Sequence, residues 1–218
     1  MSQFLQQKVD GILISLAQNT SQFDHLEEII ANKTILVLFD KLARTINCSK
    51  VFIDDKRGGF KATQHLIKKG CTKIAHFRGG LNPQNSIDRY LGYREALSFY
   101  DIKYDSKKVL ISSNGSIKEG YLLAKQLYDS QIKIDGLFCI TDMVALGAIR
   151  FYHEQKINVP NEICVIGFSK TMVGDLVYPS LSTIDQKALK MGKMAVKLFL
   201  SEEKILKTEN RLGNQSLV

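Results

Sequence analysis

Nearly continuous apolar runs recur along the 218-residue chain, and they constrain its fold more than any other feature. Each run is rich in Val, Ile, Leu and Phe and lacks the alternation of a half-exposed strand: residues 9–14, 34–39, 50–54, 73–77, 108–112, 135–140 and 162–168. Such runs are typical of strands buried on both faces of a parallel sheet. None approaches the roughly 20 residues that cross a bilayer, so we expect no membrane-spanning helix.

Amphipathic helical patterns separate most of these runs. Apolar side chains recur at steps of three and four, as in the series Ile117, Tyr121, Ala124 and Tyr128. Strands that alternate with helices indicate βαβ units and a doubly wound α/β fold. The interval between residues 34–39 and 50–54 is too short for a helix, so we expect a loop there.

Charge and cysteine usage indicate which partners and which cellular compartment suit the chain. Lys and Arg outnumber Asp and Glu by 30 to 22, which permits an anionic partner without naming one. The cysteines are far apart in the sequence and form no C-x-x-C pair: Cys48, Cys71, Cys139 and Cys164. The first twenty residues also lack the pattern of a secretory signal. We therefore expect reduced thiols, buried at Cys139 and Cys164, and a cytoplasmic location.

Motifs of enzymes and cofactor sites are absent from the sequence. It contains neither G-x-G-x-x-G nor G-x-x-x-x-G-K-[ST], and we expect the Gly58–Gly59 pair to form a turn. Gly167 to Thr171 begins like a nucleophile elbow, but the last glycine is missing and no histidine lies beyond His153. The histidines have no metal-ligand spacing. We expect neither an enzyme nor a metal or cofactor site.

Polar residues follow several of the predicted strands, where open parallel sheets bind their ligands. These residues are Asp40 and Lys41, Asp54 and Asp55, Thr141 and Asp142, and Ser169 and Lys170. They suit a small polar ligand. A structural alternative exists for two of them, because Asp54 and Asp142 are also placed to cap the helices that follow. A phosphoacceptor receiver domain would also order an Asp, a hydroxyl and a Lys in this way, but it is about half as long and carries its acidic pair after the first strand.

Five segments of the chain carry a recognisable pattern. They are VFIDDKRGGFKATQHLIKKGCTKIAHFRGG at 51–80, RYLGYREAL at 89–97, CITDMVALGA at 139–148, VPNEICVIGF at 159–168 and PSLSTIDQ at 179–186. In this order and spacing they resemble the effector-binding region of the LacI/GalR family of bacterial transcription regulators. The resemblance covers nearly the whole chain.

The resemblance implies a type I periplasmic-binding-protein fold with two doubly wound parallel-sheet subdomains. By analogy, residues 1–70 with 186–218 form the N-terminal subdomain and residues 71–185 the C-terminal one. A small molecule, usually a sugar or nucleobase, is held between the subdomains in this family. The implied protein is a homodimeric regulator in which ligand closes the cleft and changes operator affinity.

The resemblance also implies a set of ligand residues. Arg89 matches best, because a guanidinium can hold two hydroxyls or a carboxylate; the competing interpretation is a surface or salt-bridging arginine. Asp40 and Lys41 match an acidic–basic pair, although arginine is usual at the second position. The remaining matches are Thr141, where an Asn is common, Asp142, and Gln186, which either binds ligand or braces the hinge.

Two departures from the family pattern matter. Ser169 stands where the family commonly has an aspartate, so the ligand's polarity or geometry should differ and its identity cannot be carried over. The chain also lacks the family's helix-turn-helix and the first strand–helix–strand unit of its N-terminal subdomain. We expect part of a longer regulator that reaches operator DNA through a helix-turn-helix absent from this chain. The alternative is a sugar-binding receptor module without DNA function. The sequence leaves open the effector, its inducing or co-repressing role, and the regulated genes.

Overall fold

A computed structural model describes residues 4, 6, 7, 9–17 and 20–215, and the side chains only as far as residue 204. The chain divides into two compact units. The first comprises Met1–Ile53 and Ala188–Val218, and the second comprises Asp54–Lys187. Each unit has its own parallel sheet.

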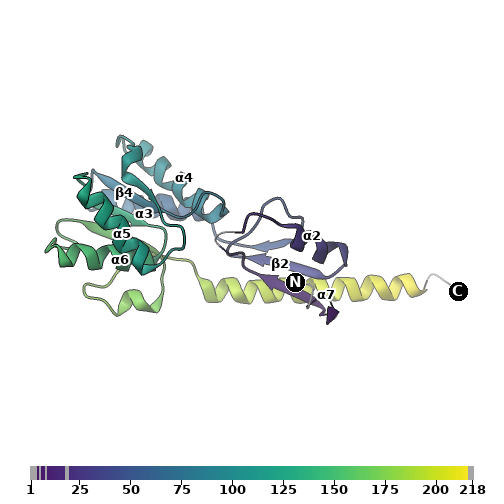
Figure 1. Ribbon diagram of the computed structural model, residues 1–218. Helices are drawn as coiled ribbons and strands as arrows, with labels where there is room; N and C mark the ends of the chain where they lie inside the picture. Colours follow the sequence, from purple (N-terminus) through teal and green to yellow (C-terminus); the bar gives the residue numbers. More distant parts are fainter. Residues whose placement is uncertain (1–3, 5, 8, 18–19, 216–218) are drawn as a thin grey trace. The chain divides into compact units, whose positions relative to one another are not determined.

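The first unit is built on three parallel strands in the order β1-β2-β3 (Figure 1). They are β1 (Gly11–Ile14), β2 (Ile35–Phe39) and β3 (Ser49–Val51). Leu36 and Leu38 of β2 pack with helix α2 (Asp24–Ala31), whereas Ile35 and Val37 pack with helix α7 (Ala188–Gln215). Alternate side chains of β2 therefore enter two different cores, which explains its uninterrupted apolar sequence. The expected loop after β2 is confirmed, because residues 40–48 contain no helix.

The second unit contains five parallel strands in the order β5-β4-β6-β7-β8. Their bounds are β4 (Ile74–Arg78), β5 (Val109–Ile111), β6 (Gly136–Cys139), β7 (Cys164–Ser169) and β8 (Ser182–Asp185). The apolar runs predicted the first four of these strands. Strand β8 was missed because its sequence, STID, is short and mostly polar; it pairs with β7 at the sheet edge, Ser169 against Asp185.

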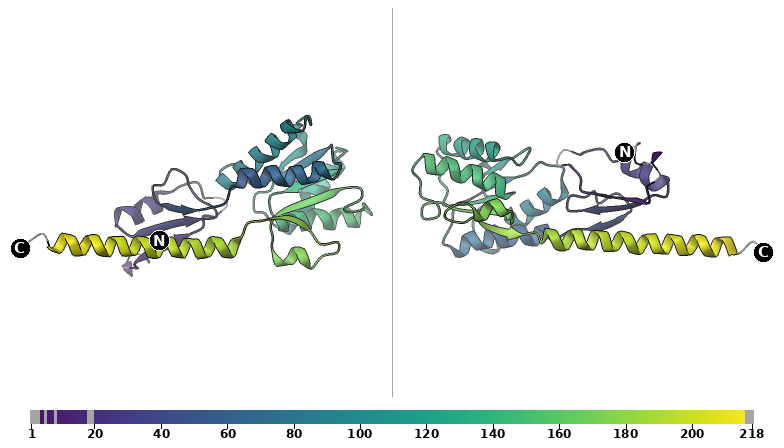
Figure 2. Two further views of the ribbon diagram at one scale, coloured as in Figure 1. Left: turned by 180° about the vertical axis from the view of Figure 1, so that it is seen from behind. Right: turned by 90° about the horizontal axis from the view of Figure 1, so that it is seen from below.

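Helices cover both faces of this second sheet (Figure 2). They are α3 (Asp55–Lys68), α4 (Gln84–Phe99), α5 (Ile117–Asp129) and α6 (Asp142–Glu154), with short 3₁₀ turns η1 (Ser106–Lys108) and η2 (Met172–Asp175). Ala75 and Phe77 of β4 pack with α5 and α6. Their neighbour His76 faces α4, stacking near Tyr90 and Tyr93. The predicted α/β class with two parallel sheets is confirmed.

Glycines let the paired helices of the second unit approach closely. A Cβ atom on Gly59 would lie 2.2 Å from the carbonyl oxygen of Arg89, and one on Gly92 would lie 2.0 Å from that of Lys56. Any side chain at these positions would push α3 and α4 apart. The expectation of a turn at Gly58–Gly59 is wrong, since both residues lie inside α3.

The unit boundaries differ from the expected ones near residues 70 and 186. Helix α3 lies before residue 70 in the sequence, yet it packs on α4 and on strands of the second sheet. Its inner face buries Ala62, Thr63 and Leu66. The first crossing between units therefore falls at Ile53–Asp54, ahead of α3, and the second at Lys187–Ala188.

No helix in the described part of the chain combines the length and apolarity needed to cross a membrane.

Candidate functional site

Arg89 of α4 holds together three elements at the carboxyl end of the five-stranded sheet. Its Nε donates to Oδ1 of Asp55 at 2.8 Å, at the start of α3, and its Nη1 donates to the carbonyl oxygen of Ile140 at 2.8 Å, just past β6. The guanidinium carbon lies 3.6 Å from the ring centroid of Phe168 on β7. The residue is only 2% exposed. Arg89 thus fixes the residues that precede Thr141 and Ser169.

Gly58 leaves room for the Phe168 ring on which Arg89 stacks. A Cβ atom at Gly58 would lie 2.7 Å from the Phe168 ring, so a larger residue in α3 would displace the ring on which Arg89 stacks. A cation over an aromatic face is stabilised most when the pair is shielded from water, as here.

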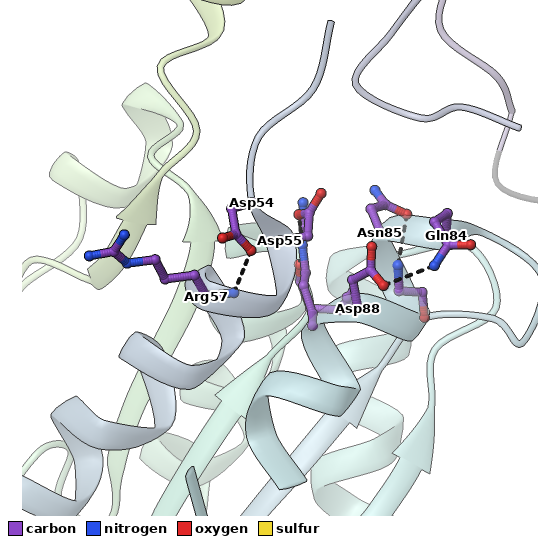
Figure 3. A network of polar contacts seen from close by, with 9 residues as sticks. Asp54, Asp55, Arg57, Gln84, Asn85 and Asp88 are labelled. Atoms are coloured by element: carbon purple, nitrogen blue, oxygen red, sulfur yellow. Dashed lines mark hydrogen bonds and ion pairs between the residues drawn. The ribbon is translucent and has the colours of Figure 1, made fainter. Parts of the chain in front are cut away.

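The starts of α3 and α4 form a polar cluster beside this ion pair (Figure 3). Oδ1 of Asp54 accepts from the backbone N–H of Arg57 at 2.8 Å, so the alternative role of Asp54 as a helix cap is confirmed. On α4, Nε2 of Gln84 donates to Oδ1 of Asp88 at 2.8 Å. Sequence reasoning missed the role of Asp55, because 34 residues separate it from Arg89 and no motif links them.

Thr141 lies half-buried at the end of β6 and caps α6. Its Oγ1 accepts from the backbone N–H of Val144 at 3.4 Å and donates to the carbonyl oxygen of Gly115 at 3.4 Å. The cap is therefore Thr141, and the expectation that Asp142 caps this helix is wrong. Both contacts of the hydroxyl are long, and they link α6 to the loop after β5.

Glu119 organises that loop, residues 112–116. Its carboxylate accepts from Oγ of Ser112 at 2.6 Å and from the backbone N–H groups of Ser113, Asn114 and Gly115 at 2.9–3.0 Å. Partial burial raises the pKa of Glu119, but these hydrogen bonds outweigh it and hold the pKa below its ordinary value. The loop that adjoins Thr141 is thus held by an ionised carboxylate.

Asp142 is fully buried and braces the other side of the edge. Its carboxylate accepts from the backbone N–H of Thr171 at 2.7 Å, from Oγ1 of Thr171 at 3.0 Å and from Oγ1 of Thr183 at 2.5 Å. These bonds connect α6 with the segment after β7 and with β8. Asp142 is therefore buried within the protein, and its carboxylate oxygens accept hydrogen bonds from Thr171 and Thr183.

Ser169 is the last residue of β7, and Gln186 directly follows the neighbouring edge strand β8. Ser169 has φ 130° and Lys170 has φ 56°, so the chain turns sharply where β7 ends. Asp185, opposite Ser169 in the β7–β8 register, binds Lys187 Nζ at 2.7 Å and lies 3.9 Å from Lys170 Nζ. Bonds from Lys187, and to a lesser extent the charge of Lys170, hold the pKa of Asp185 below its usual range. Gln186 follows directly and is half-buried.

Asp40 and Lys41 occupy the corresponding position in the first unit, directly after β2. Asp40 adopts a left-handed conformation (φ 59°), and its N–H donates to the carbonyl oxygen of Val51 at 3.1 Å. The carbonyl oxygen of Lys41 accepts from the N–H of Leu16 at 2.9 Å. The backbone at both residues is therefore fixed. The expected ligand residues thus lie at the carboxyl ends of the two sheets; Arg89 reaches this edge from α4, and Asp142 is buried behind it.

The described residues contain no group of three or more His, Cys, Asp and Glu side chains placed to hold a metal ion. All four cysteines are free thiols. Cys139 is buried as expected, whereas Cys164 is only partly covered, which corrects the prediction for that residue.

The arrangement of two parallel sheets with polar carboxyl edges agrees with comparisons to known proteins. A sequence profile of the periplasmic binding protein-like domain matches residues 63–214. The chain belongs to this family. Membership rules out the receiver-domain alternative. The resemblance to the effector-binding region of LacI-type regulators is confirmed by curated relatives and by solved structures.

Three relatives illustrate the similarity. The ribose operon repressor of Halalkalibacterium halodurans is 29% identical over 92% of this chain and 58% of its own length. The transcription regulator CcpA of Lactococcus lactis superposes with a TM-score of 0.85 at 25% identity, covering 93% of this chain and 73% of that one. A complex of the transcriptional regulator CelR with cellobiose gives 0.83 at 25% identity, covering 93% and 62%. The chain spans about 57–61% of the length of three curated relatives that it matches.

Proposed function

We propose that this effector domain senses a sugar or a related polar metabolite and adjusts the affinity of a transcription regulator for operator DNA. The observation that carries the proposal is the polar carboxyl edge of the second sheet, where Ser169 ends β7, Thr141 lies just beyond β6 and Gln186 directly follows β8. Arg89 contacts two of those strand ends, through its bond to Ile140 after β6 and its stacking on Phe168 of β7. Open parallel sheets bind ligands at this edge.

The chemistry of the edge favours a hydroxyl-rich ligand. Ser169 and Thr141 each offer a hydroxyl, and Gln186 offers both a donor and an acceptor. In the first unit, Asp40 and Lys41 add an anion and a cation after β2. The sequence contains no tryptophan, so a large flat ligand has no indole ring on which to stack. The ribose operon repressor and the CelR–cellobiose complex among the relatives support a sugar.

The proposed mechanism is a shift of population between arrangements of the two units. A ligand that engages residues of both units stabilises the arrangement in which both sets of contacts form. We propose that the regulator is a cytoplasmic homodimer and that this shift changes how it presents a helix-turn-helix, located outside this chain, to operator DNA.

A thermal-shift screen of monosaccharides, disaccharides, sugar acids and purines on this chain tests the binding step. A sugar that binds should raise the melting temperature in proportion to the logarithm of its concentration above Kd. Ser169→Ala should weaken binding about tenfold by removing one hydrogen bond. Ser130→Ala is the matched control, because Ser130 is exposed after the C-terminal end of α5. Equal affinity of the Ser169 and Ser130 variants would remove Ser169 from the site.

A gel-shift assay with the longer regulator tests the second step. The sugar found in the screen should change operator affinity, whereas this chain alone should not select an operator. Sugar binding without any effect on DNA would support the receptor module and overturn the regulatory proposal.

A further inference from the structure

Cys71 and Cys164 meet at the amino end of the second sheet, away from the proposed ligand edge. Cys71 lies between α3 and β4, and Cys164 is the first residue of β7. Both bind the same carbonyl oxygen, that of Asp135: the Cys71 thiol at 3.2 Å and the backbone N–H of Cys164 at 2.9 Å. Two residues that are 93 positions apart in the sequence thus share one acceptor atom.

The absence of a side chain at Gly136 makes room for Cys71 next to the start of β7. Gly136 on β6 is the register partner of Cys164 on β7, and register partners of parallel strands project to the same face of the sheet. A Cβ atom on Gly136 would lie 3.0 Å from Cβ and 3.2 Å from Sγ of Cys71. Cys71 therefore occupies the space left by Gly136, beside Cys164.

We propose that Cys71 and Cys164 are an oxidation-sensitive thiol pair that closes to an intramolecular disulfide on reaction with a hydroperoxide. The sulfur of Cys164 attacks the peroxide, the O–O bond breaks, and a sulfenic acid and one water molecule form when hydrogen peroxide is the oxidant. The sulfur of Cys71 then attacks the sulfur of Cys164. The S–O bond breaks, the S–S bond forms, and the released hydroxide leaves as water with the proton of Cys71.

Access distinguishes the roles of the two residues. Cys164 is partly exposed and lines a cavity of about 390 Å³ together with His65, Lys69 and Ser182, whereas Cys71 is only 4% exposed. Burial, followed by the negative charge of an ionised Cys164, raises the pKa of Cys71 to about 12. Cys71 therefore stays a thiol at neutral pH and reacts second.

The disulfide would connect the start of β7 to the residue ahead of β4, across β6, which lies between these strands. A bond that closes so long a stretch of chain restricts the unfolded ensemble and raises the melting temperature. For a chain of this size we expect a rise on the order of 5–10 °C. The proposal does not depend on the identity of the effector.

Peptide mapping of the full chain tests the proposal directly. The reduced, desalted protein is treated with hydrogen peroxide, alkylated and digested without reductant. The number of titratable thiols should fall from four to two, and one peptide pair should link Cys71 with Cys164. Dithiothreitol should restore all four thiols and reverse the rise in melting temperature. Oxidation of Cys164 to the sulfinic acid with Cys71 still free, or a linkage through another cysteine, would overturn the proposal.

Single variants assign the roles. Cys71→Ser should leave a sulfenic acid on Cys164 that dimedone traps, and Cys164→Ser should prevent the loss of thiols. Cys48→Ser is the matched control, because Cys48 is also partly exposed but lies in the first unit; it should still form the disulfide. Peptide mapping of the wild-type chain decides the proposal even where a variant folds poorly.

Discussion

Nε of Arg89 lies 2.8 Å from Oδ1 of Asp55, and the two side chains are only 2% and 7% exposed. Such a pair is costly to desolvate, and removing one partner leaves a charge buried without its counter-ion. The same guanidinium bonds to the carbonyl oxygen of Ile140 and stacks on Phe168. Arg89 therefore stabilises the proposed ligand edge by holding α3, the end of β6 and β7 together. This buried ion pair agrees with the competing interpretation of a salt-bridging arginine, and ligand binding by Arg89 stays a prediction.

Loss of either partner should destabilise the second unit strongly. We expect Asp55→Ala and Arg89→Ala each to lower the free energy of unfolding by about 3–5 kcal/mol, and the double variant to cost less than their sum. Urea denaturation followed by circular dichroism measures these values. Lys56→Ala is the control, because Lys56 and Glu95 form an exposed pair worth at most about 1 kcal/mol. Equal effects at Lys56 and Asp55 would contradict the structural role.

Truncation of Asp142 should remove the hydrogen bonds that connect α6 with β8 and with the segment after β7. Asp142→Ala leaves the N–H of Thr171 and the hydroxyls of Thr171 and Thr183 without their acceptor, at a cost of about 2–3 kcal/mol. Asp142→Asn keeps one oxygen and should cost less. Thermal unfolding ranks the two variants, with Asp129→Asn as a control at an exposed carboxylate. A stable Asp142→Ala protein with lost sugar binding would instead indicate direct ligand contact.

His76 should make stability depend on acid. Burial, together with the smaller effects of the charges of Arg78 and Arg89, lowers the pKa of His76 to about 3, against the opposing bond to the carbonyl oxygen of Phe138. The unfolded chain binds a proton near pH 6.5 and the folded chain does not. This contribution to stability is therefore complete above pH 6.5 and declines as the pH falls towards 3.

The His76→Phe variant tests this dependence, because it keeps a ring against Phe138 and cannot titrate. Between pH 6.5 and 4 the wild-type chain should lose about 3 kcal/mol more than the variant. Chemical denaturation at a series of pH values provides the comparison. His153→Phe, at the end of α6, is the control. Parallel pH profiles for wild type and His76→Phe would show that the residue is not held neutral.

Glu119 should also make the protein less stable as the pH falls, because its ionised carboxylate holds the loop at residues 112–116. Its folded-state pKa lies below the ordinary value, so the stabilisation is present above about pH 4.5 and is lost as the pH falls through the lower folded value. Glu119→Gln should lower the melting temperature at pH 7 and flatten this acid dependence. It should also weaken sugar binding, because the loop it holds adjoins Thr141. Unchanged affinity would separate the loop from the ligand site.

Features that depend on neighbouring residues in the sequence were predicted better than features that depend on distant ones. Apolar runs predicted the buried strands, since a strand covered on both faces must be apolar at every position. The same rule missed β8, whose Thr183 is held by Asp142 at the sheet edge. The Asp54 cap followed from local chemistry, whereas the cap of α6 proved to be Thr141, one residue earlier than expected.

The sequence by itself determined the α/β class, most strand positions, the family and the strand ends where polar residues gather, because these depend on short-range pattern and motif. Only the tertiary structure decided that Arg89 pairs with Asp55, that α3 belongs to the second unit, and that Cys71 and Cys164 share the carbonyl oxygen of Asp135. Each of these contacts joins residues or elements that are distant along the chain. Glycines assist these contacts, because the backbone of Arg89 lies against Gly59 and the side chain of Cys71 lies against Gly136.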